Sequence, residues 1–114
     1  MTALDETLEA ITDWFAHAEY SGLILPRGWF GRPFDNQHLL TWAHARQGKL
    51  LLELDDQLLL VLTTPGRPDT KDRNLTVTFA QLVFDWQGYG DLQPHAEVFS
   101  DGEIQFVGHP MSTM

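Results

Sequence analysis

Residues 50–62 read Leu-Leu-Leu-Glu-Leu-Asp-Asp-Gln-Leu-Leu-Leu-Val-Leu, and this stretch decides the fold. Two apolar runs, 50–54 and 58–62, flank the turn-forming residues 55–57. Short apolar runs bounded by turn residues are typical of neighbouring antiparallel strands. Because neither run alternates between apolar and polar residues, we expect both strands to be covered on both faces, or nearly so, and therefore to be central in a sheet.

Strand patterns also lie on both sides of this hairpin. Residues 38–46 predict one strand, and a Gln47-Gly48 turn joins it to the first leucine-rich run. Residues 75–79 alternate apolar side chains with threonine, which predicts a strand whose apolar residues face inward. Residues 82–86 continue that strand beyond a bend.

The last strand pattern is a predicted hairpin. Residues 97–99 and 104–107 are strand-like, and the Asp101-Gly102 pair between them is a favoured hairpin turn. The polar segment 63–74 and the glycine-containing segment 87–94 show no periodicity, so we expect both to be surface loops.

The N-terminal segment 4–18 has the periodicity of an amphipathic helix. Thr2 and Asp5 resemble a capping box at its start, and Gly22 supplies a stop after its end. The apolar residues at helical spacing are Leu4, Leu8, Ile11, Trp14, Phe15 and Ala18.

These patterns predict an α+β fold, because one helix precedes a block of strands without alternating βαβ units. We expect an N-terminal helix packed on a curved antiparallel sheet of five or six strands. The sheet could also close into a partial barrel, and the sequence does not decide between these two forms. The 114 residues fit a single domain, with the helix at 4–18, the strands within 38–107 and a flexible tail at 109–114.

Charge is distributed unevenly along the chain. The formal net charge is −9, yet all seven cations lie between Arg27 and Arg73. Residues 27–49 are locally basic, with Asp35 as their only acid. Because a negative overall field repels phosphate backbones, we expect no nucleic-acid partner.

Composition also limits the compartment and the chemistry. The chain has no cysteine, which excludes disulfide bonds, thiolate metal sites and cysteine nucleophiles. Residues 1–6 lack the basic start and apolar run of a signal peptide. The longest apolar run, 58–62, is far shorter than the roughly 20 residues that span a membrane. We expect a soluble, cytoplasmic protein without membrane contact.

The most distinctive loop is Gly28-Trp29-Phe30-Gly31-Arg32-Pro33-Phe34-Asp35-Asn36. Three large aromatic residues in one loop indicate that it buries, binds or docks something. We favour a structural role, in which the aromatic residues fill the gap between helix and sheet. The functional alternative is a binding site that draws on neighbouring residues. The candidate binding residues are Trp29, Phe30, Arg32, Asp35, Asn36, His38, Trp42, Trp86 and Tyr89.

Metal and cofactor chemistry find little support in the sequence. His38 and His44 fall on one face of the predicted strand but about 20 Å apart, too far to share an ion. No metal, phosphate or dinucleotide motif is present, so we expect no cofactor. Glu53 and Asp85 interrupt apolar strands, and we expect both to point to solvent.

Two function classes follow. The favoured one is a non-enzymatic binding or protein-interaction module, with a protein partner or self-association into a homodimer. The alternative is a small-molecule pocket, enzymatic or not, in the hollow of the sheet. In that case Arg32 would hold an anionic group, His38 or His44 would act as acid or base, and Asp35 would orient it.

Overall fold

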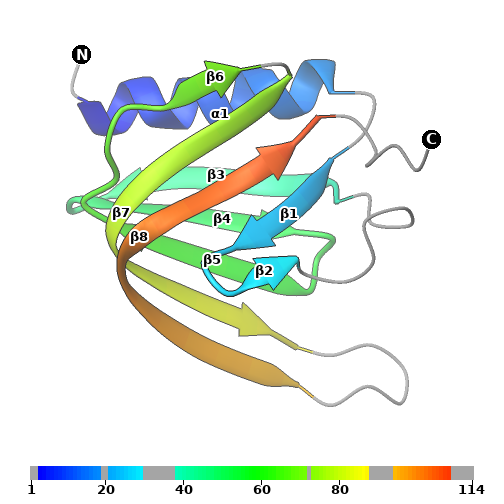
Figure 1. Ribbon diagram of the computed structural model, residues 1–114, viewed down its shortest axis with the longest axis vertical. Helices are drawn as coiled ribbons and strands as arrows, with labels where there is room; N and C mark the ends of the chain where they lie inside the picture. The colour runs from blue at the N-terminus through cyan, green and yellow to red at the C-terminus, as the bar shows by residue number, and fades with distance from the viewer. Residues whose placement is uncertain (1–2, 19–20, 30–37, 72, 88–93, 109–114) are drawn as a thin grey trace.

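The computed structural model describes residues 3–18, 21–29, 38–71, 73–87 and 94–108. Figure 1 shows one helix and one large antiparallel sheet, which confirms the α+β prediction. The elements in chain order are α1 (Ala3–His17), β1 (Gly22–Leu25), β2 (Gly28–Trp29), β3 (Leu40–Arg46), β4 (Lys49–Leu54), β5 (Leu58–Thr63), β6 (Asp69–Lys71), β7 (Asn74–Trp86) and β8 (His95–Val107).

The sheet folds into two layers. Its strand order is β2-β1-β8-β7-β5-β4-β3, with β6 pairing beside β7. We call the part built on residues 74–79 and 102–107, with β1, β2 and β6, the front layer. The back layer contains β3, β4 and β5 with residues 81–86 and 95–100. Figure 1 shows the long curved strands β7 and β8 passing from one layer to the other.

Within the described residues the sheet has eight strands, more than the five or six predicted. It is also open rather than a closed barrel, because β2 and β3 lie at its two ends without pairing to each other. The additional strands are short. The two-residue β2 and the three-residue β6 carry too few residues to produce a readable alternation.

A break in side-chain alternation marks the bend between the layers. Leu75, Val77 and Phe79 are buried, and the next buried residue is Leu82, three positions later instead of two. At this point the pairing ladder skips Ala80 and its counterpart on β8. One residue out of alternation on each strand lets the ribbon turn while its apolar side chains stay inside. The predicted bend in this strand is confirmed.

The hairpin predicted around Asp101-Gly102 is wrong, because β8 runs without reversal from His95 to Val107. It pairs along the whole of β7, from Trp86 opposite His95 to Leu75 opposite Phe106. Gly102 lies opposite Phe79, whose ring carbons are 3.6 and 3.7 Å from where a Cβ of Gly102 would sit. A Cβ at residue 102 would therefore make only ordinary van der Waals contact with Phe79, and the Asp101-Gly102 pair is part of a continuous strand instead of a turn.

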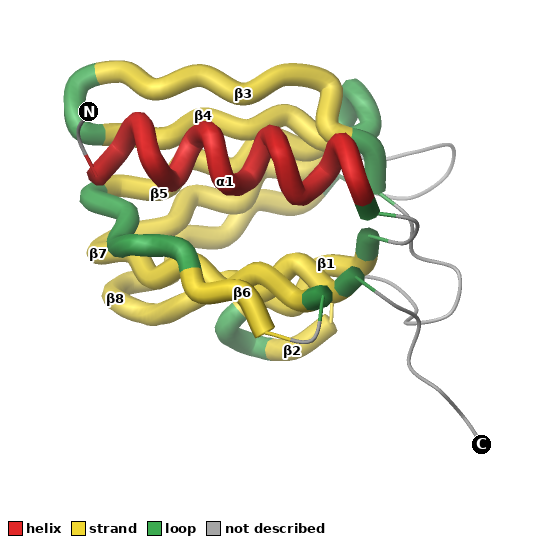
Figure 2. Tube along the Cα trace, turned by 90° about the horizontal axis from the view of Figure 1, so that it is seen from above, coloured by secondary structure: helices red, strands yellow, loops and turns green. Residues whose placement is uncertain are grey.

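Helix α1 covers the opening between the two layers. Figure 2 shows it lying along the molecule between β3 and β6, with β4 and β5 beneath. Ile11 is fully buried, and the Trp14 and Phe15 rings lie 5.9 and 5.4 Å from the Phe106 ring. The hydroxyl of the buried Thr7 donates a 2.9 Å hydrogen bond to the Gly66 carbonyl oxygen. The predicted apolar face is therefore the face that packs.

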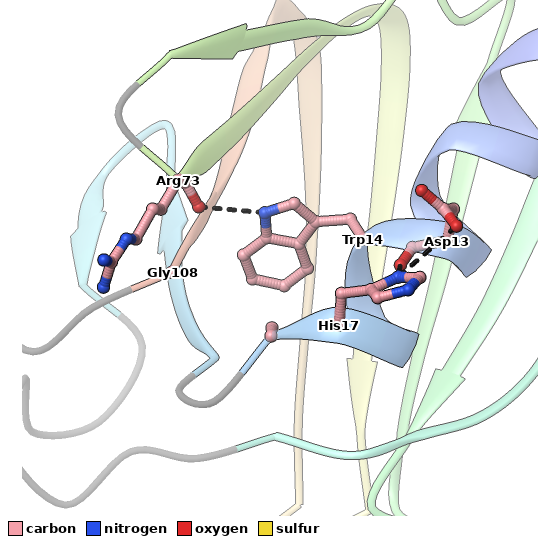
Figure 3. A pocket seen from close by; sticks show the side chains of 6 residues that line it. Asp13, Trp14, His17, Arg73 and Gly108 are labelled. Carbon is pink, nitrogen blue, oxygen red and sulfur yellow. Dashed lines mark hydrogen bonds and ion pairs between the residues drawn. The ribbon is translucent and has the colours of Figure 1, made fainter.

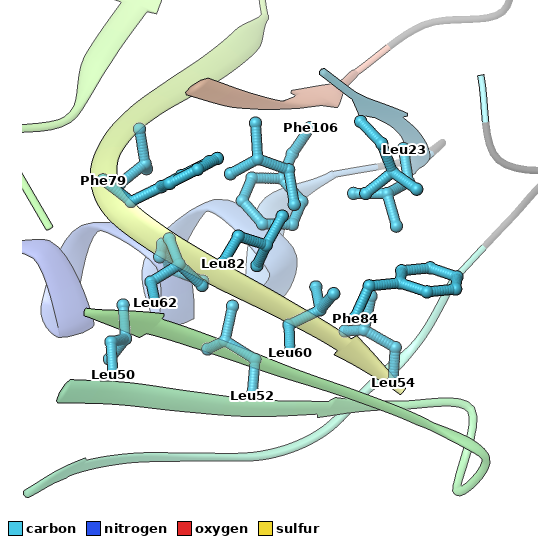
Figure 4. Close-up of a cluster of buried hydrophobic side chains, with 14 of the residues drawn as sticks. Leu23, Leu50, Leu52, Leu54, Leu60, Leu62, Phe79, Leu82, Phe84 and Phe106 are labelled. Atoms are coloured by element: carbon cyan, nitrogen blue, oxygen red, sulfur yellow. The ribbon is translucent and has the colours of Figure 1, made fainter. Parts of the chain in front are cut away.

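Both leucine-rich strands contribute alternate residues to the core. Figure 4 shows these side chains pointing from β4 and β5 toward Leu23, Phe79 and Phe106. The fully buried leucines of the two strands are Leu50, Leu52, Leu54, Leu58, Leu60 and Leu62.

Several connections differ from expectation or lie outside the described residues. The predicted Gln47-Gly48 turn is present, with φ of 52° and 77°. Residues 63–74, expected to be a loop, contain β6, and Gly22 begins β1 by pairing with Val107. Thr2, the tail 109–114 and residues 88–93 are not described. No helix in the described part of the chain is long and apolar enough to cross a membrane.

Candidate functional site

The hairpin of β4 and β5 carries large aliphatic side chains on both of its faces. Its even-numbered leucines fill the core between the layers. The intervening residues Leu51, Glu53, Leu59 and Val61 point the other way and remain partly exposed. In an antiparallel sheet with one wet face those positions are usually polar.

The strand register joins the outward residues into rows across the back layer. Leu51 pairs with Val61, Val61 with Val83, and Val83 with Val98. Directly paired residues of antiparallel strands project from the same face, so these four side chains form a continuous aliphatic row. Val98, at its end, is 63% exposed. His44 of β3 pairs with Leu51 and closes the other end.

Two further rows flank this aliphatic row, and the three rows together are called the outer face below. The cationic row is Arg46, Lys49, Thr63, Gln81 and Ser100. The acidic row is Trp42, Glu53, Leu59, Asp85 and Ala96. Glu53 and Asp85 therefore point outward, as expected from the sequence.

The charges of the outer face are separated by the aliphatic row. Arg46 and Lys49 are direct cross-strand partners of the same sign, an arrangement that destabilises a sheet. Neither cation forms an ion pair with a described residue, and the same holds for Glu53 and Asp85. The outer face thus carries a positive edge, an apolar centre and a negative edge.

The outer side of the front layer provides an internal comparison. There Ile24 pairs with Gln105, Gln105 with Thr76, and Thr76 with Asp69. Only one of these four side chains is apolar, which is typical of a sheet face in water. These four positions of the front layer are therefore more polar than the aliphatic row of the back layer, although the front-layer row ends at Trp29 of β2, which pairs with Ile24.

His38 takes part in a buried polar cluster near the start of β3. Its ring Nδ1 lies 2.6 Å from the Asp55 carboxylate, whose other oxygen accepts a 2.8 Å hydrogen bond from the Leu39 backbone N–H. The Ser21 hydroxyl donates to the His38 carbonyl oxygen and accepts from its N–H. Because Ser21 bonds to the main chain and not to the imidazole, these residues hold the chain together rather than form a nucleophilic triad.

A second polar cluster lies where β8 begins. Glu97 accepts hydrogen bonds from Arg27 Nε at 2.9 Å to each carboxylate oxygen, and it lies 2.5 Å from His95 Nε2. The Arg27 guanidinium is also 6.0 Å from the centre of the Phe84 ring. The hydrogen bond from His95 and the hydrogen bonds and charge of Arg27 hold the pKa of Glu97 below its ordinary value of 4.5.

The lowered pKa of Glu97 predicts a pH-dependent contribution to stability. A carboxyl whose pKa is depressed on folding stabilises the fold above its unfolded pKa, and the contribution disappears as pH falls through the folded pKa. We expect Glu97→Gln to lower the free energy of unfolding by about 0.5–1 kcal/mol near pH 7. Urea unfolding from pH 7 to pH 3 should show this difference shrinking toward zero at the acid end. A difference that grows at low pH would contradict the assignment.

A surface pocket of about 360 Å³ lies at the C-terminal end of α1 (Figure 3). Two of its side-chain nitrogens form hydrogen bonds with backbone carbonyl oxygens. Trp14 Nε1 donates a 2.9 Å hydrogen bond to the Arg73 carbonyl oxygen, and His17 Nδ1 lies 2.9 Å from the Asp13 carbonyl oxygen. Figure 3 shows the Arg73 guanidinium pointing away from Trp14. The lining residues are Asp13, Trp14, His17, Ala18, Arg73 and Gly108.

The residues proposed from the sequence occupy different places. Trp42 is on the outer face and 41% exposed, whereas Trp86 packs against the core and His38 is buried beside Asp55. His44 also lies on the outer face rather than in the hollow. The backbone of Trp29 belongs to β2. The side chain of Trp29 and the residues Phe30, Arg32, Asp35, Asn36 and Tyr89 lie outside what the structure describes.

Sequence reasoning did not identify the aliphatic row itself. Its signal is present in the leucine-rich runs 50–54 and 58–62, for which the sequence predicts strands covered on both faces, or nearly so. In the described structure only the inner face of these strands is covered.

Neither a metal site nor similarity to known proteins indicates the function of this chain. Within the described residues, no three histidine, aspartate or glutamate side chains converge as metal ligands would. Comparison with protein-family models, curated protein sequences and solved structures finds no match. The function must therefore be argued from the surface itself.

Proposed function

We propose that this protein is a non-enzymatic protein-interaction module that binds its partner through the outer face of the back layer. The observation that carries the proposal is the aliphatic row Leu51, Val61, Val83 and Val98, which crosses the sheet without cover from any described element. Contiguous apolar patches on a folded domain are characteristic of interaction surfaces.

The composition of the outer face fits this role. An apolar centre bordered by charged and polar residues is the usual anatomy of a protein interface. Trp42 at one corner is exposed and belongs to the residue types that dominate binding energy in such interfaces. The back layer bends away from its outer face in Figure 1, and such a convex face suits a macromolecular surface better than a small ligand.

The small-molecule alternative has less support. In the pocket at the end of α1, Trp14 Nε1 and His17 Nδ1 already form hydrogen bonds with backbone carbonyl oxygens of the protein. The histidine and carboxylate that do meet, His38 and Asp55, anchor the main chain around β3. Catalysis would need polar groups that converge on an accessible cavity.

The proposal can be tested by photo-crosslinking from two positions of the same strand. A photoreactive amino acid at position 98 lies on the outer face, and one at position 105 lies on the polar outer side of the front layer. In cells that make the protein, we expect position 98 to give a discrete protein adduct and position 105 to give none. Equal crosslinking from both positions, or none from position 98, would contradict the proposal.

A further inference from the structure

We infer that the partner is a second copy of this chain, packed face to face on the outer face with a two-fold axis running along the aliphatic row. This inference rests on the proposed function and names its partner. Its basis is the arrangement of charge, which makes the outer face complementary to itself in one orientation.

Only two symmetric orientations need comparison. Two facing surfaces related by two-fold symmetry have their axis in the plane between them. An axis along the strands, through the central strand β5, would place Arg46 over Ser100 and Lys49 over Gln81 of the other copy, which are uncharged. It would also place Glu53 over Asp85 of the other copy, a pair of like charges. An axis across the strands, along the aliphatic row, exchanges the two edges, so that the cationic row of each copy meets the acidic row of its partner. Opposite charges then meet at both edges, and the second orientation is favoured.

The matching is specific within each strand. With the axis along the aliphatic row, β4 lies over β4 of the second copy. Lys49 of each copy therefore faces Glu53 of the other copy. On β3, Arg46 comes over Trp42, an arrangement in which a guanidinium can stack on an indole. The aliphatic row meets itself. Both the like-charged pair Arg46–Lys49 and the exposed valine row thereby acquire partners.

The size of the outer face is sufficient for a reversible dimer. Five strands about 4.8 Å apart and five or six residues long at about 3.3 Å each give a face of roughly 24 by 18 Å. Covering it on both copies removes on the order of 1,000 Å² of surface from water, near the lower limit for specific interfaces. Aligned sheet packing with a rotation of about 30° is the standard geometry for two such faces. We expect dissociation in the micromolar range.

Pairing of two β3 edges is the competing arrangement, because β3 ends the sheet. The β3 ladder is irregular between Leu40 and Trp42, which shortens the straight edge available to another strand. Val98 distinguishes the two arrangements. It lies in the interface if the outer faces pack together, but it is four strands away from the interface if two β3 edges pair.

Charge reversal measured by analytical ultracentrifugation tests the inference. The wild-type chain should show a concentration-dependent mass rising from 13.0 kDa toward twice that value. Lys49→Glu and Glu53→Lys should each weaken the dimer about tenfold, because each places two like-charged pairs in the interface. The double variant K49E/E53K should return to within about threefold of wild type. If the double variant dimerises as weakly as the sum of the two single effects predicts, the inferred axis would be overturned.

A second variant separates the face from the edge. Val98→Lys should abolish the dimer, whereas Gln105→Lys, in the same strand but on the front layer, should leave it unchanged. A dimer that survives Val98→Lys would show edge pairing and overturn the inference.

The inference and the proposed function fail in different ways. A chain that stays at 13.0 kDa at millimolar concentration, yet crosslinks from position 98 to another protein, would overturn the second copy as partner and retain the protein-binding surface. A monomer that also fails to crosslink would overturn both.

Discussion

Leu60→Asp should unfold the domain, whereas Val61→Asp, one residue further along the same strand, should leave it folded. Leu60 is fully buried in the core, and its partners Leu52 and Phe84 are fully buried too. A carboxylate there would lie in an apolar environment without an ionic partner. The cost exceeds about 4 kcal/mol, which is a large part of the stability of a domain this size.

Val61 points to the outer face, where an added carboxylate keeps access to water in the single chain. We expect Val61→Asp to lower the free energy of unfolding by about 1 kcal/mol or less, through reduced strand preference. Circular dichroism measures whether each variant is folded, and urea unfolding measures how much each substitution lowers the free energy of unfolding. Equal loss of structure in the two variants would show that the outer face is also core, and would remove the basis for a binding surface.

Phe106→Ala should have the second largest effect, with a loss of about 3–5 kcal/mol in the free energy of unfolding. Phe106 is fully buried, lies between Leu23 and Leu75 in the ladder, and contacts the aromatic rings of Trp14 and Phe15. The substitution therefore removes the aromatic contacts between α1 and the front layer, as well as leaving a cavity.

The neighbouring Gln105→Ala is the matched control, because Gln105 faces outward in the same strand. It should change the free energy of unfolding by less than about 0.5 kcal/mol. The tryptophan fluorescence spectrum, to which Trp14 contributes as one of four tryptophans, should shift in the Phe106 variant and stay constant in the control, since only the former alters the environment of the Trp14 indole. A Phe106 variant as stable as the control would contradict the packing described for α1.

The elements that could be predicted from sequence are those with strong local patterns. The helix, the leucine-rich hairpin and the strand beginning at Leu75 each repeat apolar residues over enough positions to define a period. The turn Gln47-Gly48 was predictable because its chemistry is local, and both residues adopt positive φ.

The errors arose where distant partners decide the structure. Asp101-Gly102 has the composition of a turn, but the full length of β7 is available for pairing, and the backbone hydrogen bonds of β8 continue along it. Likewise β1 forms because Leu23 finds Phe106 at the other end of the chain. No local pattern in residues 22–25 contains that information.

The candidate surface was missed for a related reason. A continuous apolar run shows that both faces of a strand are apolar, but the nature of the cover on each face depends on the tertiary arrangement. The leucines that were expected to be buried on both sides are split by the fold, with Leu60 inside and Val61 outside. Only the register reveals that Val83 and Val98 extend the same row.

The pairing of β1 with β8 also has a consequence during protein synthesis. Gly22 and Leu23 leave the ribosome long before Val107 and Phe106, the residues they pair with. Until the last strand emerges, β1 can pair only with the two-residue strand β2, while the leucine-rich hairpin can already form from neighbouring residues. A ribosome stalled before β8 would therefore display a partly folded back layer and an amphipathic N-terminal segment that lacks its main partner in the sheet, the kind of sequence that holding chaperones bind.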